Sequence, residues 1–294
     1  TYPLWYCQEV EGIRPDVRVV NLSLIAVDWY VAQLRRKVND APAIDMSISQ
    51  EQLRGYKRVQ VPFYSPGGQE PEMTLEQLLK FVGEDHPVPA QGGRDFDSYV
   101  PTHKVIIPVN KQAMVAKGLI GADDPNVVDT IRFDLGDRSY LIKDDIAILD
   151  IISSNINKRP IYWAVTTRDE KLMGLGDYLQ LEGLSLRLVP IQSRGDGGSY
   201  GLIGSGRVAT DIAFENITKK WRWGNFDKER LYVNRSYMPS LQTMRVAMIR
   251  IARNLIFEGK KDKAEALANK YFEVFPEYNF PYDQFAAFMA DIYA

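Results

Sequence analysis

The sequence predicts an α/β protein, in which a layered α/β domain with a mixed sheet is followed by a helical repeat tail. Helix-like and strand-like segments alternate from the N-terminus, as in layered α/β folds, whereas residues 241–294 show only helical periodicity. Residues 193–206 hold six of the 21 glycines, which favours a loop or linker. We therefore expect an α/β domain over 1–192, a Gly-rich loop and junction over 193–240, and a helical repeat over 241–294.

Helix signals recur along the chain. Thr74 with Gln77 three residues on forms a capping box, and proline or aspartate suits other helix starts. Helices are expected over residues 3–10, 28–37, 75–82, 146–155, 241–257 and 261–275, with Asp28 capping the second and Asp144 or Asp145 the fourth.

Strand signals are short runs that alternate or are wholly apolar. They predict strands over residues 17–24, 104–109, 161–165 and 184–189. Residues 130–133 and 140–142 are separated by a loop that contains Gly136, and we interpret them as a hairpin.

Composition excludes several classes of protein and site. Lys and Arg number 36 against 38 Asp and Glu, so the chain lacks the basic excess of a nucleic-acid-binding protein. His86 and His103 are the only histidines, which excludes a three-His zinc site, and the single Cys7 excludes an intramolecular disulfide. No stretch approaches the roughly 20 apolar residues of a membrane helix.

The two ends of the sequence suggest a fragment of a longer protein. Thr1 replaces an initiator Met and no signal peptide follows it. Ala294 ends the chain inside an apolar-periodic run that has no helix-ending Gly or Pro.

Motifs for chemistry are weak. Residues 204–209 match a dinucleotide fingerprint by letters, but a glycine-rich loop stands where a strand is required, so we favour a linker. Acidic pairs lie at residues 9 and 11, 123 and 124, and 144 and 145. A turn explains the second pair and a helix cap the third more simply than catalysis does, and Glu9 and Glu11, two residues apart, would point to different sides of a helix. We therefore predict no catalytic residue and no metal or cofactor site in this chain. A sugar-active hydrolase that uses some of these acids stays open as an alternative.

The helical tail has the spacing of a tetratricopeptide repeat. Ala252, Ala264 and Pro276 occupy the small, small and proline positions of such a repeat, with a turn at residues 259–262. Ala286 follows Ala252 by one full period of that repeat, where a second unit would place its small residue. A generic helical hairpin is the alternative.

Several blocks of sequence resemble one known family. Residues 1–22 read TYPLWYCQEVEGIRPDVRVVNL, and shorter matches occur at residues 28–30 (DWY), 60–64 (QVPFY), 159–164 (RPIYWA), 181–184 (LEGL), 188–190 (LVP) and 223–225 (WGN). The chain resembles the C-terminal region of a bacterial family of multi-spanning membrane proteins. That family was first catalogued as a domain of unknown function and is related to the eukaryotic transmembrane O-mannosyltransferase.

The resemblance implies a part of a lipid-linked-sugar glycosyltransferase. This chain would be its soluble part, attached to an N-terminal domain in the inner membrane and facing the periplasm. The catalytic acid is expected in the membrane domain, so no catalytic residue is carried over. A lipid-linked sugar donor, and a divalent metal as a further candidate, would belong to the full-length protein, and the acceptor would be a polypeptide or glycan.

The predicted binding residues are mainly aromatic. The recognisable N-terminal blocks supply most of them, and a basic-aromatic run at residues 219–223 supplies a weaker patch. The set is Trp5, Tyr6, Glu9, Asp28, Trp29 and Tyr30, with Trp221 and Trp223 as the second patch. Two alternatives stay open, namely that these aromatics pack in the core, and that the chain is a free-standing scaffold whose repeats bind a protein partner.

Overall fold

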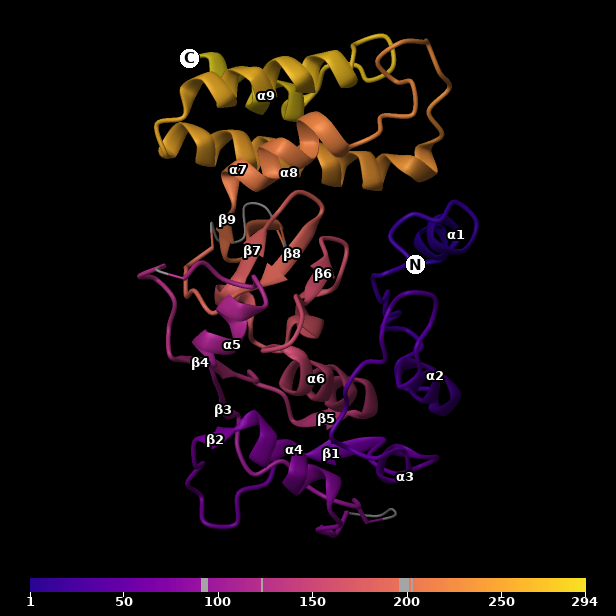
Figure 1. The fold of residues 1–294 in the computed structure, drawn as a ribbon, viewed down its shortest axis with the longest axis vertical. Helices are drawn as coiled ribbons and strands as arrows, with labels where there is room; N and C mark the ends of the chain where they lie inside the picture. Colours follow the sequence, from indigo (N-terminus) through magenta and orange to yellow (C-terminus); the bar gives the residue numbers. More distant parts are fainter. Residues whose placement is uncertain (91–94, 123, 196–200, 202) are drawn as a thin grey trace. The chain divides into compact units, whose positions relative to one another are not determined.

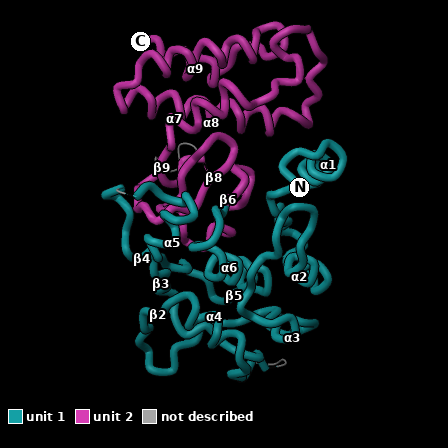
Figure 2. Tube along the Cα trace, in the orientation of Figure 1, with its two compact units in different colours: residues 1–161 teal, residues 162–294 magenta. Residues whose placement is uncertain are grey.

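The computed structural model describes residues 1–90, 95–122, 124–195, 201 and 203–294. The chain forms two compact units, residues 1–161 and 162–294 (Figure 2). Both contain helices and strands (Figure 1), so the predicted α/β class is confirmed. The division into domains at residues 192 and 240 stays a prediction.

Unit 1 distributes its strands over two small sheets. β1 (Gln60–Pro62) pairs antiparallel with β5 (Tyr140–Ile142), whereas β3 (Lys104–Pro108) lies between parallel β2 (Met73–Thr74) and antiparallel β4 (Thr130–Asp134). Its helices are α1 (Tyr2–Glu9), α2 (Asp28–Leu34), α3 (Gln50–Leu53), α4 (Leu75–Gly83), α5 (Lys111–Ala116) and α6 (Lys143–Asn155).

Helices α4 and α6 pack together and supply much of the core of unit 1. Leu78 and Leu79 of α4 and Ile146 and Leu149 of α6 are almost fully buried. The capping box predicted for α4 is present, because the Thr74 hydroxyl accepts from the Gln77 N–H and the Gln77 side chain accepts from the Thr74 N–H. Local sequence and tertiary packing therefore agree at α4.

A buried carboxylate ties an irregular segment to α6. Asp150 is fully buried and accepts from the Ser47 N–H at 2.8 Å, the Ser47 hydroxyl at 2.6 Å and the Ile48 N–H at 3.1 Å. The Asn155 amide, further along α6, donates to Asp45 O at 2.8 Å. These bonds satisfy backbone groups that have no strand partner, which explains how residues 45–48 pack without regular structure.

Unit 2 combines a four-stranded sheet with a helical tail. The strand order is β6-β8-β7-β9, in which only the β7–β9 pair is parallel. The elements are β6 (Tyr162–Ala164), η1 (Asp169–Leu172), η2 (Gly176–Tyr178), β7 (Leu179–Leu181), β8 (Ser185–Leu188), β9 (Arg207–Val208), α7 (Thr210–Glu215), the π-helical η4 (Asn216–Lys220), η5 (Arg235–Tyr237), α8 (Met238–Phe257), α9 (Lys261–Val274), α10 (Gln284–Ala290) and η6 (Asp291–Tyr293).

Helix α8 anchors the sheet of unit 2 through a buried arginine. The Arg250 guanidinium donates to Gly206 O at 2.6 Å and also to Ile203 O. Gly206 has φ +57°, and a Cβ there would lie 1.9 Å from Leu179 O, so only glycine fits. Gly206, just before β9, is therefore bonded to Arg250 of α8 and packed against the backbone of Leu179 in β7.

Helices α8, α9 and α10 pack together in the tail. Ala252 and Ala264, the small residues of the predicted repeat, are both fully buried, and Ala286 of α10 is nearly so. Small buried residues allow close approach of helices. The helical tail is confirmed, and its assignment as a tetratricopeptide-like repeat stays a proposal.

The predicted strand over residues 17–24 is wrong. Residues 18–21 have no regular structure and residues 22–26 form turns, because the Asn21 side chain accepts from the Ser23 N–H at 3.0 Å and the Asn21 N–H donates to the Tyr30 hydroxyl at 2.7 Å. Side chains therefore take up backbone bonds that a ladder would use.

The predicted hairpin between residues 130 and 142 is also wrong, although both strands exist. β4 pairs with β3 and β5 with β1, so the two are in different sheets. The Asp134 carboxylate accepts from the Gly136 N–H at 2.7 Å, and Leu135 N–H donates to His103 O at 3.0 Å, which turns the chain away from a hairpin.

Two helix starts or ends also differ from expectation. α2 stops at Leu34 instead of residue 37, and Val27 occupies its cap position while Asp28 is its first residue. α6 begins at Lys143, and the Asp145 carboxylate accepts from the Ile142 N–H at 3.3 Å, so Asp145 supports the first turn from inside the helix. The Gly-rich segment 193–206 lies partly outside the described residues, as does Asp123.

The described residues include neither a candidate membrane span nor a candidate metal cluster. None of the helices there is both long and apolar enough to span a bilayer. No group of three or more His, Cys, Asp or Glu side chains there is arranged to hold a metal ion.

Candidate functional site

Helix α1 presents aromatic side chains and buries none of its residues. Tyr2 and Tyr6 are 71% and 56% exposed, and Trp5 is half-buried. The ring of Trp5 meets that of Tyr2 edge-on, with 5.5 Å between centroids. A helix of a folded protein normally buries one apolar face, so the exposure of α1 is unusual, and a binding role for Trp5 and Tyr6 stays a prediction.

The C-terminal end of α1 is tethered by polar contacts within unit 1. Gln8 Nε2 donates to Arg14 O at 2.8 Å and to Val17 O at 2.7 Å. Asn39, which follows α2, donates from Nδ2 to Glu9 Oε1 at 2.8 Å. Of the predicted site residues, Glu9 is therefore occupied in positioning α1.

Asp28 at the start of α2 makes structural contacts. Its carboxylate accepts from the Gly55 N–H at 2.9 Å and from Lys143 Nζ at 3.4 Å. The bond from Gly55, together with the nearby Lys143 ammonium, holds the pKa of Asp28 below its ordinary value. In its ionised form, Asp28 therefore links the start of α2 to Gly55 and to Lys143 of α6.

Trp29 and Tyr30 are neighbours with opposite environments. Trp29 is 59% exposed, whereas Tyr30 is 3% exposed and its hydroxyl accepts from the Asn21 N–H. Burial raises the pKa of the Tyr30 hydroxyl. Their rings meet edge-on at 5.6 Å. Tyr30 therefore belongs to the core of unit 1, whereas Trp29 lies at the surface and its binding role stays a prediction.

Trp221 and Trp223 pack inside unit 2 and are both half-buried. Their ring centroids lie 5.5 Å apart, and Trp223 meets Phe275 edge-on at 5.9 Å. A Cβ at Gly183 would come within 3.3 Å of Trp221, so that ring covers the glycine closely. Packing accounts for these contacts, and a binding role for the pair stays a prediction.

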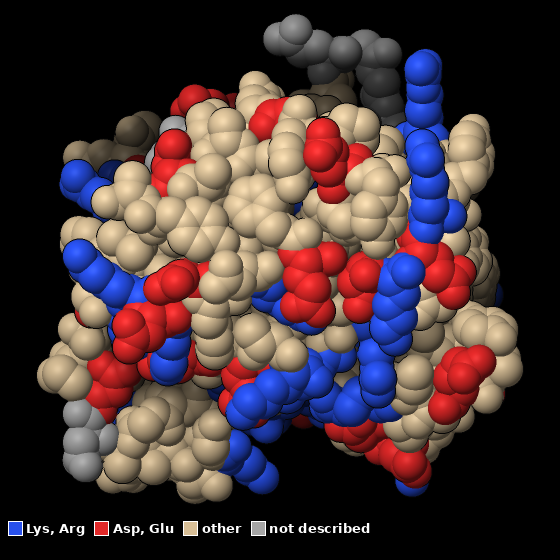
Figure 3. Space-filling view, turned by 90° about the horizontal axis from the view of Figure 1, so that it is seen from above, with Lys and Arg blue, Asp and Glu red and all other residues tan. Residues whose placement is uncertain are grey.

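The charges of the molecule are mixed. On the face drawn in Figure 3, acidic and basic side chains lie among uncharged ones, and neither sign covers the face alone. This agrees with the formal charge of -2 and offers no continuous basic surface on that face for a nucleic acid.

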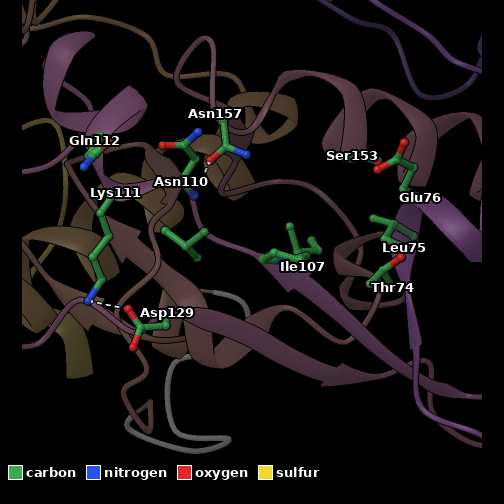
Figure 4. A pocket seen from close by; sticks show the side chains of 12 residues that line it. Thr74, Leu75, Glu76, Ile107, Asn110, Lys111, Gln112, Asp129, Ser153 and Asn157 are labelled. Atoms are coloured by element: carbon green, nitrogen blue, oxygen red, sulfur yellow. Dashed lines mark hydrogen bonds and ion pairs between the residues drawn. The ribbon is translucent and has the colours of Figure 1, made fainter.

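A pocket in unit 1, lined by both polar and aliphatic residues, was not predicted from the sequence. It has a volume of about 630 Å³ and lies where β3 ends, beside the first turn of α4 and the C-terminal end of α6 (Figure 4). We call it the β3–α5 pocket and define it by Glu76, Ile107, Asn110, Lys111, Ser153 and Asn157. Its size falls within the usual range of about 300–1,000 Å³ for ligand sites.

Two asparagines on one side of this pocket are held by backbone groups. Asn157 Oδ1 accepts from the Asn110 N–H at 3.2 Å, and Asn110 Oδ1 accepts from the Ala113 N–H at 2.9 Å as the cap of α5. Beside them Lys111 forms an ion pair with Asp129 at 2.8 Å. The sequence does contain one signal for this pocket. Asn110, which caps α5, comes just after the buried strand β3, and ligand sites often lie at strand ends.

The comparisons with known proteins then gave one match. Residues 1–211 match the family model described as TMEM260-associated domain 2. The searches of curated proteins and of solved structures found no similar protein. The match spans all of unit 1, the sheet of unit 2 and the blocks through residue 190 that carry the sequence resemblance.

Proposed function

Because this chain belongs to the family of TMEM260-associated domain 2, we propose that it is a domain of a membrane glycosyltransferase. The match over residues 1–211 is the observation that carries this proposal, since it relates the chain to the O-mannosyltransferase family. In this proposal the chain is not catalytic by itself, and the acid that acts on the sugar lies in the membrane domain.

The proposed setting is the bacterial inner membrane, with this chain on the periplasmic side. Its first partner would be its own N-terminal membrane domain. The lipid-linked sugar donor, and a divalent metal if the reaction uses one, would bind to that domain of the full-length protein.

The proposed role is to dock the acceptor, either a polypeptide or a glycan. The exposed aromatic rings of α1 and of Trp29 support this role, because aromatic faces stack on sugars and on apolar side chains. Trp221 and Trp223 are a second, weaker candidate surface. Glu9, Asp28 and Tyr30 would act by positioning, since each already has a partner within unit 1.

The helical tail suggests a second partner. We interpret α8, α9 and α10 as tetratricopeptide-like, because Ala252 and Ala264 are buried between helices at the spacing of that repeat. A chain whose repeats bind a protein partner without any membrane domain is therefore the second candidate function.

Fractionation of native cells separates the two candidates. An antibody raised against this chain should detect a band much larger than the chain itself in the inner-membrane fraction. That protein should then transfer sugar from a lipid-linked donor, and Trp29→Ala should weaken acceptor binding without changing the melting temperature. A free band of the mass of this chain alone would contradict the glycosyltransferase proposal and favour the scaffold.

A further inference from the structure

The β3–α5 pocket holds amide donors whose direction is set by the backbone. An asparagine oxygen that accepts from an N–H leaves its NH₂ group on the other branch of the amide. In Asn110 and Asn157 the oxygen is used in this way, and within the described residues neither Nδ2 has an acceptor. The Nδ2 groups of Asn110 and Asn157 can therefore donate hydrogen bonds to water or to a ligand in the pocket.

Another side of the pocket supplies acceptors. Glu76, in the first turn of α4, and Ser153, on α6, line it, and neither side chain has a partner among the described residues. Ile107 lies between the two groups in Figure 4, and Pro108 and Val109 also line the pocket, so its floor is aliphatic. A ligand that fits must carry both donors and acceptors around a body with apolar C–H groups.

The charge of the side chains that line the pocket favours a neutral ligand over an anionic one. Lys111 is paired with Asp129, and Glu76 adds a carboxylate, so the ionised side chains lining the pocket sum to about -1 at pH 7. A phosphate, a uronic acid or the pyrophosphate of a lipid donor would meet net repulsion. A neutral polyhydroxy ligand would not, because sugar hydroxyls both donate and accept.

We propose that the β3–α5 pocket binds a neutral hexose unit, either free or at the end of a glycan acceptor. This inference rests on the proposed function, and gives acceptor docking a second place apart from the aromatic rings of α1. Asn110 and Asn157 donate to the sugar hydroxyls, Glu76 and Ser153 accept from others, and the ring C–H groups lie on Ile107. Because no aromatic ring lines the pocket, a single sugar binds weakly, with a Kd of about 1 mM or higher.

Methyl resonances of the intact chain test this directly. Ile107, Leu75 and Val109 line the pocket, so their methyl groups in an Ile/Leu/Val-labelled sample report its occupancy. The probes are mannose, galactose and N-acetylglucosamine, titrated to about 50 mM, well above the expected Kd. Mannose 6-phosphate and an unglycosylated Ser/Thr-rich peptide are titrated in parallel. We expect saturable shifts of these three methyls with at least one neutral sugar and none with the phosphate or the peptide.

Asn157→Asp is the informative variant. Aspartate keeps the oxygen that accepts from the Asn110 N–H, but replaces the donor NH₂ with a charged acceptor. We expect at least about a tenfold loss of affinity, as for removal of a hydrogen bond with an added repulsion. Asn234→Asp is the matched control, because Asn234 Oδ1 also accepts a backbone N–H, that of Ser236, outside the pocket. The control should bind like the wild type.

The outcomes separate this inference from the proposed function. Neutral sugars that shift no pocket methyl, or that still bind Asn157→Asp as tightly, would overturn the pocket assignment. Shifts of the pocket methyls by the peptide alone would overturn the ligand class. Neither result affects the fractionation experiment that tests the proposed function. Conversely, a free protein of the mass of this chain that binds sugar in this pocket would support the pocket assignment and contradict the glycosyltransferase proposal.

Discussion

Helices α1 and α9 both carry aromatic residues but bury them to very different extents. α1 buries none of its residues, so Tyr2 and Tyr6 face solvent. Tyr271 of α9 and Phe275, at the C-terminal cap of that helix, are each 1% exposed. The difference comes from neighbours, since α9 packs against α8 and α10, whereas α1 is held mainly by polar bonds near its end. Aromatic content therefore does not distinguish core from binding surface, and burial must be known.

A buried arginine shows how the tail secures its aromatic cluster. Arg245 Nε donates to the Tyr271 hydroxyl at 2.6 Å, and its two terminal nitrogens bond the Asp283 carboxylate at 2.9 and 2.6 Å. The guanidinium also lies 5.5 Å from the Tyr271 ring centroid. Burial opposes ionisation of Asp283, but the bonds from Arg245 outweigh it and lower the pKa.

The largest effect is expected from Arg245→Ala. Its loss leaves the buried Tyr271 hydroxyl without this donor, whereas Asp283, which is 39% exposed, keeps the bonds from the Phe285 and Ala286 N–H groups. We expect the free energy of unfolding to fall by about 2–3 kcal/mol. Chemical denaturation measures this. Arg222→Ala is the control, since the Arg222 side chain is exposed and exposed substitutions usually change stability by about 0.5 kcal/mol or less. Equal losses in both variants would contradict the assigned difference between core and surface.

Tyr30→Phe tests the buried member of the neighbouring residues Trp29 and Tyr30 in α2. The change removes the hydroxyl that accepts from the Asn21 N–H and leaves that donor without its partner, at a cost of about 1–2 kcal/mol. Thermal unfolding with Tyr6→Phe as the exposed counterpart measures the difference. A loss in Tyr6→Phe as large as that in Tyr30→Phe would mean that α1 is packed more firmly than its exposure indicates.

Asp28→Asn should lower stability in a pH-dependent way. The pKa of Asp28 is lowered in the folded state, so its carboxylate stabilises the fold at pH values above the unfolded pKa of about 3.9. This contribution is lost as the pH falls through the lower folded pKa. Because Asp28 is about two-fifths exposed, we expect only about 0.5–1 kcal/mol at pH 7.

Denaturation of wild type and Asp28→Asn across pH checks this sign. The difference in their free energies of unfolding should be constant near neutrality and shrink below about pH 4. A difference that instead grows in acid would show that Asp28 is held in its protonated form.

The smallest effect is expected from Trp29→Ala. With 59% of its surface exposed, Trp29 should contribute no more than about 0.5 kcal/mol to stability. Calorimetry of the variant measures this. A loss near the roughly 3–5 kcal/mol of a buried Trp would place Trp29 in the core and remove it from the binding prediction.

Local signals in the sequence predicted local structure well. The capping box at Thr74 and the apolar run of β3 both gave elements within one or two residues of expectation. The alternation at residues 17–24 did not, because Asn21 forms its own turn and a strand needs a partner elsewhere in the chain. The β3–α5 pocket was missed because its lining residues come from four segments that only folding brings together.

By itself the sequence determined the α/β class, most helices, the helical tail and the family, because caps, periodicity and motifs are local. Only the tertiary structure decided which strands pair, since β5 finds β1, far earlier in the chain, through the buried contact of Val61 with Leu141. It also decided which aromatics are exposed. Strand pairing and aromatic exposure both depend on packing between residues that are far apart in the sequence. For this reason the adjacent aromatic residues Trp29 and Tyr30 differ strongly in burial.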